Sequence, residues 1–505
     1  MKFAARSPPA SPPPDSSIDV APAPPRRGAR LFFVATIVAQ ASALLRYVVL
    51  ARILGPEQLG LAATLVVTAA FFDMISETGS DRFLIQDREG GQPAVQELVQ
   101  LVYVGRGLLI AAGLVIFAIP IAHFYKDSRL AAGIAFLAIS PLIAGFTHLD
   151  IRRTQRHLDF RSEAINRMAG EGASLIATAV AAWLTRDFTA ILYGLITRSI
   201  VMVAVSHMGA ERRYRLGYSR EHGPRLAKFA APLMLTGLML FIGSQGDRVV
   251  VANTLGVKTL GHYAAVLLLI YYPSAVILNY IHVLYVPLVA AQRDDPAARD
   301  AVSDGLGGLT LLLGVAMVLG FAVVAPVMVP ILYGGRYREP WLIVGLIGVL
   351  QTTRFLIVWP TTVALSMGHS RTVLAGNFVR LLAFPGAYAG AWLFGGLTGV
   401  VGGFIVGELV SIAVTLALVN RDTGSPLFSI GFDRFAIFIA AGACVIAGGY
   451  AVDHGSPTLG VVAAGGAALV IAVILRREIR AIAAAMVLAR SLAAPVLARV
   501  GARGR

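Results

Sequence analysis

Residues 50–60 read LARILGPEQLG and residues 251–261 read VANTLGVKTLG, so the pattern L-G-x-x-x-L-G occurs twice, 201 positions apart. Each copy lies between two long apolar runs. Two further pairs of similar segments follow in the same order at a spacing of 208: residues 124–139 with 332–347, and the segments around Gly194 and Gly402. Three pairs of similar segments in the same order predict an internal repeat. Chance similarity between glycine-rich loops is the alternative.

The composition indicates a membrane protein. Of 505 residues, 57% are apolar and 14% are charged, and the mean hydropathy is +0.73. Soluble domains average roughly 25% charged residues. The single cysteine, Cys444, excludes a disulfide framework and a cysteine-based metal site.

Fourteen apolar runs are each long enough to cross a hydrocarbon core of about 30 Å. They are 31–53, 59–77, 98–122, 129–147, 168–185, 188–208, 229–252, 260–290, 305–332, 341–366, 372–394, 397–419, 434–452 and 457–475. With the N-terminus inside, the inner segments carry 30 Lys and Arg against 7 in the outer loops. This asymmetry predicts that both termini are cytoplasmic. The net charge of +15 then lies mostly beside anionic lipid headgroups, which explains it without a nucleic-acid partner.

The repeat and the runs together predict the fold. Six runs separate the repeated motifs, and because six is even, the two halves have the same orientation in the membrane. We therefore expect an all-α polytopic membrane protein of about 14 transmembrane helices, with two parallel six-helix lobes and two extra C-terminal helices. The expected segments are a disordered proline-rich cytoplasmic tail (1–30), an N-lobe (31–208), a basic cytoplasmic linker (209–228), a C-lobe (229–420), two further helices (421–475) and a basic amphipathic cytoplasmic tail (476–505).

Ionisable side chains inside the runs are the candidate functional residues, because a charge in hydrocarbon must be paired, line a water-filled cavity or reach the headgroups. The candidate substrate-binding residues are Arg46, Arg106, Arg198, Arg248, Arg354 and Arg380. The candidate ion-pair or coupling residues are Asp73, Asp247 and Glu408. By depth, Asp73 and Arg106 could pair near the cytoplasm, whereas Arg46 and Arg248 could snorkel to the outer headgroups. For Arg198 and Arg354, nearest the midplane, we expect a cavity or interior pairing.

An arginine-lined cavity would suit an anionic ligand, because guanidinium groups bind phosphate oxygens in a bidentate manner. Four prolines inside the runs would allow bending between access states: Pro232, Pro273, Pro287 and Pro360. No lysine follows a glycine, so the chain has no G-K-[ST] phosphate-binding loop, and no two histidines have zinc-protease spacing. We predict neither catalytic residues nor a metal or cofactor.

Several motifs, in order, resemble the polysaccharide transporter or oligosaccharide flippase family, within the multidrug/oligosaccharidyl-lipid/polysaccharide exporter superfamily. They are ARILGPEQLG (51–60), RHLDFRSEA (156–164), GDRVVVANTLGVKTLGHYAA (246–265), VLYVPLVAAQRDD (283–295), LYGGRYREPWLIVGLI (332–347) and GHSRTVL (368–374). The resemblance implies two lobes around a V-shaped, often cationic cavity that alternates between the two faces of the membrane. It also gives weight to Arg46, Asp247 and Arg248, since related proteins line the cavity with the first and seventh helices.

The resemblance implies a flippase for polyprenyl-pyrophosphate-linked oligosaccharide in the bacterial inner membrane, serving O-antigen, capsule or exopolysaccharide synthesis. Membrane lipids, a polysaccharide polymerase and glycosyltransferases are the expected partners. The alternatives are an exporter of another cargo, such as a peptidoglycan lipid precursor or a drug exchanged for an ion, and a membrane polysaccharide-assembly enzyme or scaffold. A drug antiporter would favour acidic groups in its cavity, and an assembly enzyme typically needs a larger loop outside the membrane than this chain has.

Overall fold

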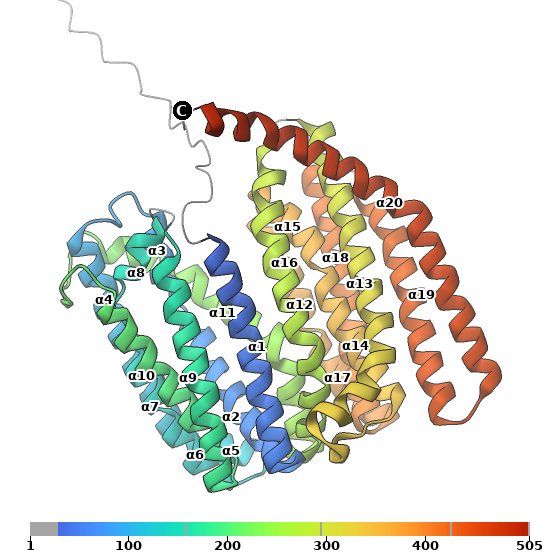
Figure 1. Cartoon of the computed structure of the whole chain (residues 1–505), viewed down its shortest axis with the longest axis horizontal. Helices are drawn as coiled ribbons and strands as arrows, with labels where there is room; N and C mark the ends of the chain where they lie inside the picture. The colour runs from blue at the N-terminus through green and yellow to red at the C-terminus, as the bar shows by residue number, and fades with distance from the viewer. Residues whose placement is uncertain (1–28, 157–158, 293–294, 425–426, 503–505) are drawn as a thin grey trace, which may run out of the picture.

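A computed structural model describes residues 29–156, 159–292, 295–424 and 427–502, and no strand occurs in these ranges. The two halves of the chain form two groups of helices that meet at the lower end of Figure 1 and diverge toward the upper end, where the C-terminus lies. We call these groups the N-lobe and the C-lobe. The proline-rich tail predicted for residues 1–30 lies, except for its last two residues, outside the described residues.

Ten helices build the N-lobe: α1 (Ala29–Leu54), α2 (Pro56–Ile75), α3 (Ser80–Gln86), α4 (Pro93–Ile116), α5 (Ala118–Phe124), α6 (Arg129–Leu137), α7 (Ile139–Ala144), α8 (Asp150–Arg156), α9 (Arg161–Thr185) and α10 (Ala190–Met208). The rest of the described chain forms α11 (Gly223–Leu255), α12 (Val257–Ala291), α13 (Pro296–Tyr333), the 3-10 turn η1 (Gly335–Tyr337), α14 (Trp341–Leu356), α15 (Val358–Ser366), α16 (Ser370–Arg380), α17 (Ala383–Phe394), α18 (Gly396–Thr423), α19 (Leu427–Asp453) and α20 (Pro457–Ala502). Most of the basic tail expected at 476–505 continues α20 without a break.

The protein is a multi-pass membrane protein, in agreement with the prediction. In the described part of the chain, twelve helices are long and apolar enough to cross a membrane, counting α14 and α15 as one span. The other two predicted spans, 129–147 and 372–394, are each divided into two short helices, α6 with α7 and α16 with α17. The number fourteen therefore stays a prediction.

Prolines explain where the predicted spans divide. Four breaks occur three residues before a proline: at Phe117, Ala138, Ile357 and Leu382, which precede Pro120, Pro141, Pro360 and Pro385. A proline has no N–H to donate and its ring clashes with the carbonyl four residues earlier, so the preceding turn is disrupted. Of the four prolines expected to allow bending, only Pro360 lies at such a break. Pro232, Pro273 and Pro287 lie inside continuous helices.

The repeated motif forms a close backbone contact between the lobes. Gly55 and Gly256 join successive helices with nearly identical positive φ angles of 87° and 86°, a conformation that L side chains rarely adopt. One turn later, Gly60 on α2 lies against Gly261 on α12. A Cβ atom on Gly60 would be 1.7 Å from the Val257 carbonyl oxygen, and one on Gly261 would be 1.9 Å from the Pro56 carbonyl oxygen. The two copies of the motif therefore pack on each other about the pseudo-two-fold axis.

Two hydrogen bonds beside this contact also follow the repeat. Arg52 Nε on α1 donates to the Leu332 carbonyl at the end of α13 (2.7 Å), and Asn253 Nδ2 on α11 donates to the Phe124 carbonyl at the end of α5 (2.7 Å). The donors are 201 positions apart and the acceptors 208 apart, the spacings of the repeat. We call this pair of hydrogen bonds the latch. Arg52 Nη2 also donates a short hydrogen bond to the Ile331 carbonyl on α13. The latch lies at the lower end of the molecule in Figure 1, where the two lobes meet.

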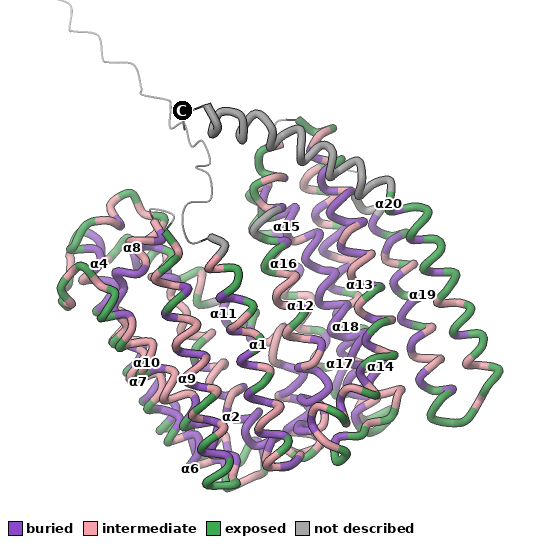
Figure 2. Tube along the Cα trace, viewed as in Figure 1, coloured by how far each residue is buried: buried purple, intermediate pink, exposed green. Residues whose placement is uncertain are grey.

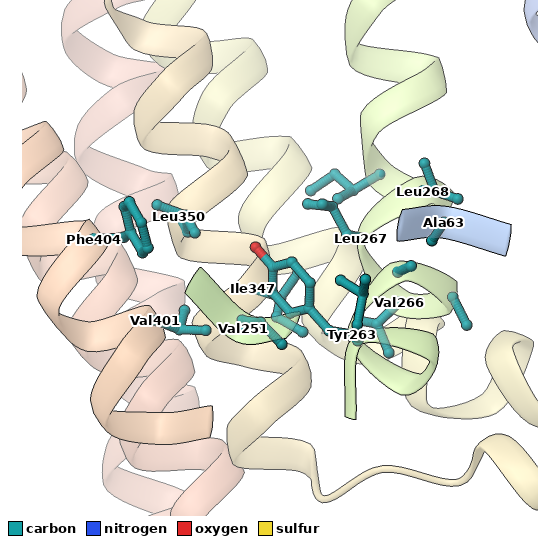
Figure 3. Close-up of a cluster of buried hydrophobic side chains, with 14 of the residues drawn as sticks. Ala63, Val251, Tyr263, Val266, Leu267, Leu268, Ile347, Leu350, Val401 and Phe404 are labelled. Carbon is teal, nitrogen blue, oxygen red and sulfur yellow. The ribbon is translucent and has the colours of Figure 1, made fainter. Parts of the chain in front are cut away.

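The C-lobe contains the larger part of the core. The most deeply buried spans are α14 with α15, and α18, which are mostly purple in Figure 2. Residues from α11, α12, α14 and α18 meet around Tyr263, while Ala63 approaches α12 from the N-lobe (Figure 3). Helix α12 thus belongs to the C-lobe core and also carries the contact with α2.

A buried arginine attaches the last two helices to the C-lobe. Arg434 on α19 lies 2.6 Å from Glu478 on α20 and 2.8 Å from Asp304 on α13, measured from Nη2 to the carboxylate oxygens. Its guanidinium also lies 5.2 Å from the centre of the Trp359 ring on α15. Helices α19 and α20, although outside the repeat, are therefore fixed to the C-lobe by a cation with two carboxylates and an aromatic face.

The glycine contact leads to a stability prediction. Gly60→Ala or Gly261→Ala should lower the free energy of unfolding by roughly 1–3 kcal/mol, because the new methyl group overlaps a backbone carbonyl that cannot rotate away. The thermal midpoint of the detergent-purified protein measures this. Gly402→Ala is the control, since a Cβ there meets no atom within 4 Å. Equal midpoints for all three variants would contradict the proposed packing.

Candidate functional site

Three helices of the N-lobe bring together two arginines and one glutamate. Arg46 Nη1 on α1 lies 3.2 Å from Glu171 Oε2 on α9 and donates a 2.6 Å hydrogen bond to Ser174. Arg198 Nε on α10 lies 2.7 Å from the other carboxylate oxygen of Glu171. We call Arg46, Glu171 and Arg198 the N-lobe triad. Its two arginines share a single carboxylate, so the triad holds one positive charge in excess.

Four helices of the C-lobe bring together a second, larger set. Arg354 on α14 lies between two carboxylates, with Nη1 3.2 Å from Asp247 on α11 and Nε 2.9 Å from Glu408 on α18. Arg380 Nε on α16 lies 2.6 Å from the other oxygen of Glu408. Tyr263 on α12 donates a short hydrogen bond to Asp247. We call Asp247, Arg354, Glu408 and Arg380 the C-lobe tetrad, and its formal charges balance.

The repeat makes three of these positions equivalent, and the two lobes carry opposite charges at each. Arg46 matches Asp247 on the first helix of each lobe, 201 positions apart. Glu171 and Arg380 are 209 apart, and Arg198 and Glu408 are 210 apart, on the last two spans of each lobe. Arg354 has no charged counterpart and neutralises the two acids of the C-lobe. The same architecture therefore holds a cationic cluster in one lobe and a neutral one in the other.

Arg248 lies where the two clusters approach each other. It donates a short hydrogen bond to Gln245, and its guanidinium lies 5.4 Å from the centre of the Tyr271 ring on α12. Its Nε and Nη2 are buried and find no acceptor among the described residues. Tyr47 on α1 interacts electrostatically with both Arg46 and Arg248, which places these two arginines near each other across the lobes.

The remaining pair lies near the end of α2, away from both clusters. Arg106 Nη2 on α4 is 2.6 Å from Asp73 and 3.6 Å from Glu77, and Arg106 Nε donates to the Ser76 carbonyl. The pairing predicted between Asp73 and Arg106 is thus present. The Asp73 side chain is largely exposed, so solvent weakens this pair compared with the buried ones.

The structure changes the sequence-based interpretation in two respects. Arg46 and Arg248 are both buried, so neither snorkels to the headgroups. Glu171, the acid on which the N-lobe triad depends, was not a predicted site residue. A lone glutamate between Gly170 and Gly172 was its only signal, and the predicted span began just before it, although α9 begins at Arg161.

Exposure separates the arginines that can receive a ligand from those that are enclosed. The Arg198 side chain is 39% exposed and has one carboxylate neighbour. The Arg354 side chain is 8% exposed and has two. Arg198 is therefore the more accessible of the two arginines, while Arg354 is enclosed between two carboxylates.

Removing the central cation of the tetrad should destabilise the protein. Arg354→Gln leaves the buried Asp247 without its ion-pair partner, while Glu408 keeps its pair with Arg380, and breaking a buried pair costs about 3 to 5 kcal/mol. The double variant Arg354→Gln with Asp247→Asn should recover part of this loss, because the uncompensated charge is removed. Thermal midpoints of the purified variants measure both effects. A single variant as stable as the wild type would show that the tetrad does not hold the C-lobe together.

Comparison with known proteins gives relatives over most of the chain. Residues 49–341 match the family described as polysaccharide biosynthesis protein. The succinoglycan biosynthesis transport protein ExoT of Rhizobium meliloti is 24% identical over 384 residues, which cover 74% of this chain and 73% of ExoT. The lipopolysaccharide biosynthesis protein WzxC of Escherichia coli is 22% identical over 390 residues, which cover 76% of this chain and 78% of WzxC.

Solved structures share the fold at lower sequence identity. The lipid II flippase MurJ, in an inward closed conformation, aligns with a TM-score of 0.60 at 13% identity, over 89% of this chain and all of MurJ. A point mutant of the Vibrio cholerae MATE transporter VcmN aligns with a TM-score of 0.55 at 12% identity, over 79% of this chain and 96% of VcmN. The two-lobed helical arrangement is therefore that of known membrane transporters.

Proposed function

The chain belongs to the polysaccharide biosynthesis protein family, and we propose that it is a flippase that moves a lipid-linked oligosaccharide across the membrane. The relatives named for succinoglycan transport and lipopolysaccharide biosynthesis support this function. The fold alone leaves the cargo open, since a lipid II flippase and a multidrug transporter share it. The charges inside the lobes favour an anionic cargo.

The excess of arginine inside the two lobes is the observation that carries the proposal. The N-lobe triad has two arginines for one acid, and the C-lobe tetrad together with Arg248 has three for two. Two positive charges are left over in a region that the membrane surrounds. A diphosphate supplies the matching negative charge and the paired oxygens that guanidinium groups bind. The cargo lipid is accordingly a polyprenyl pyrophosphate bearing the oligosaccharide.

Glu171 acts as an internal substitute for the cargo anion in this mechanism. In the empty protein its two oxygens occupy Arg46 and Arg198, so neither arginine is an unpaired charge in hydrocarbon. The pyrophosphate takes the place of Glu171 on the half-exposed Arg198. After the cargo leaves, Glu171 returns and so helps to release the product. An arginine pair without this carboxylate would bind the anion more tightly and release it more slowly.

Alternating access requires the contact between the two glycine motifs to open. The latch and the Gly60–Gly261 contact close one end of the molecule, while the lobes diverge at the other end (Figure 1). We place the diverging end, where α1 begins and α20 ends, on the cytoplasmic side, because the sequence predicts the excess of Lys and Arg there. The described conformation then faces inward in the inner membrane, where the pathway's glycosyltransferases supply the cargo and a polymerase receives it.

Substitutions in the N-lobe triad test the assignment of the anion site. Arg198→Ala should reduce export of the lipid-linked oligosaccharide by about 10- to 100-fold, because one charge-assisted hydrogen bond to phosphate is worth about 1.5 to 3 kcal/mol. Export is measured in inverted membrane vesicles at matched protein amounts. Arg82→Ala, which removes an exposed cytoplasmic cation, is the control. Undiminished export by Arg198→Ala would remove this arginine from the site.

A second substitution tests whether Glu171 competes with the cargo. Glu171→Gln removes the competing charge, so we expect tighter binding of polyprenyl pyrophosphate to the purified protein and slower turnover in the vesicles. Weaker binding by this variant would mean that Glu171 only orients the arginines and does not compete with the cargo.

Removing the latch should favour the conformation in which the outer end of the molecule is open. Replacing Arg52 and Asn253 by alanine removes three hydrogen bonds, two from Arg52 and one from Asn253. Together they are worth roughly 1.5–4.5 kcal/mol, which shifts the equilibrium by about 10-fold or more. A cysteine at Ala51, which is buried at this contact, reports opening through labelling by an impermeant maleimide from outside, in a Cys444→Ser background. Lys258→Ala is the control for lost surface charge at the same end. Unchanged labelling in the double variant would show that the latch does not hold the end closed.

A further inference from the structure

The linker between the lobes lies across the end of α4 and divides the surface there into two pockets. The Gly217 backbone N–H on the linker donates to the Glu97 carbonyl on α4 (3.4 Å). A Cβ atom on Gly217 would lie 2.8 Å from a carboxylate oxygen of Glu97, so the close crossing favours glycine. The linker beyond this crossing is fixed to the N-lobe by Arg225, whose hydrogen bond to Glu89 holds the pKa of that carboxyl below its usual range.

A polar pocket lies on one side of the crossing. It has a volume of about 250 Å³ and is lined by Pro93, Gln96, Glu97 and Gln100 from α4 and by Arg212, Arg213 and Arg215 from the linker. Arg212 is engaged with Gln96 and with the Gly91 carbonyl. Arg213 and Arg215 are exposed and form no ion pair within the described part of the chain. Three arginines against the single carboxylate of Glu97 make the pocket cationic.

Two polar groups behind this pocket are buried against each other. Gln100 is 1% exposed, and its side chain interacts with the Tyr214 hydroxyl. Gln96 also donates to the Gln100 side-chain oxygen. The exposed side chains of Arg213 and Arg215 are therefore the cations of this pocket that a ligand can reach.

An apolar pocket of about 450 Å³ lies on the other side of the crossing. Its lining residues are Thr78, Leu98, Leu101 and Val102 from the N-lobe, Tyr218 from the linker, and Gly223, Pro224, Leu226, Ala227 and Ala230 at the start of α11. Neighbouring residues of α4 line different pockets. Glu97 and Gln100 line the polar pocket, and Leu98 and Leu101 line the apolar pocket. Tyr218 and Leu216 on the linker are exposed apolar side chains at the same place.

We propose that α4 and the linker bind one anionic phospholipid of the cytoplasmic leaflet, with its phosphate in the polar pocket and an acyl chain in the apolar pocket. Arg213 and Arg215 donate to the phosphate oxygens, which is the chemistry that guanidinium groups supply. Glu97 selects against headgroups that present a second negative charge on its side. The inference does not depend on the cargo of the flippase.

The site is tested with phosphatidylglycerol as the probe. Binding to the full-length purified protein is measured by native mass spectrometry, with phosphatidylcholine as the neutral comparison. The double variant Arg213→Gln with Arg215→Gln should lower the affinity for phosphatidylglycerol about 10- to 30-fold, since each surface arginine contributes about a factor of five. The control Arg82→Gln with Arg88→Gln removes two exposed cytoplasmic arginines that do not line the pocket, and should bind phosphatidylglycerol like the wild type.

A second variant tests the apolar pocket without changing charge. Ala227 is exposed at its lining, so Ala227→Trp fills the pocket with little effect on the core, and should also weaken binding. An equal loss of phosphatidylglycerol affinity in the Arg82/Arg88 control would show that general surface charge attracts the lipid, and would overturn the proposal. Wild-type affinity in the Arg213/Arg215 variant would also overturn the proposal. Preferential binding of a polyprenyl phosphate over phosphatidylglycerol would assign the site to the cargo lipid instead.

Discussion

The backbone contact between Gly60 and Gly261 is the constraint on which the rest of the structure depends. Two helix beginnings can approach to carbonyl contact only where neither residue has a side chain, and the repeat places such a residue on both sides. The contact fixes the axis about which the lobes are related. The latch hydrogen bonds from Arg52 and Asn253 then follow from the same symmetry. Small residues thus let the lobes approach closely at this end of the molecule, as they commonly do between membrane helices.

The two lobes share an architecture but differ in electrostatics. Equivalent helices present Arg46, Glu171 and Arg198 in one lobe and Asp247, Arg380 and Glu408 in the other. Opposite charges at equivalent positions permit the same pairing geometry, while the added Arg354 makes the C-lobe cluster neutral and enclosed. The neutral cluster is enclosed within its lobe, and the cationic cluster keeps one positive charge in excess.

Some prolines break the helices that contain them and others do not. The breaks before Pro120, Pro141, Pro360 and Pro385 divide four of the predicted spans into shorter rigid pieces. The long helices α11, α12 and α13 continue through their prolines, and neighbouring packing keeps them straight enough to remain single elements. Whether a proline breaks a membrane helix therefore depends on what surrounds the freed carbonyl, which the sequence does not record.

Hydropathy, the distribution of Lys and Arg and the spacing of the glycine motifs determined the membrane class, the repeat and the parallel lobes, because these are properties of local composition and of period along the chain. The same analysis identified every arginine of both clusters. Only the tertiary structure decided their partners: Glu171 for Arg46 and Arg198, and both Asp247 and Glu408 for Arg354. The tertiary structure also showed that Arg52, although exposed, bonds to the other lobe. Those pairings depend on the rotation of each helix about its axis and on the contact of segments up to 280 residues apart. A one-dimensional pattern contains neither quantity.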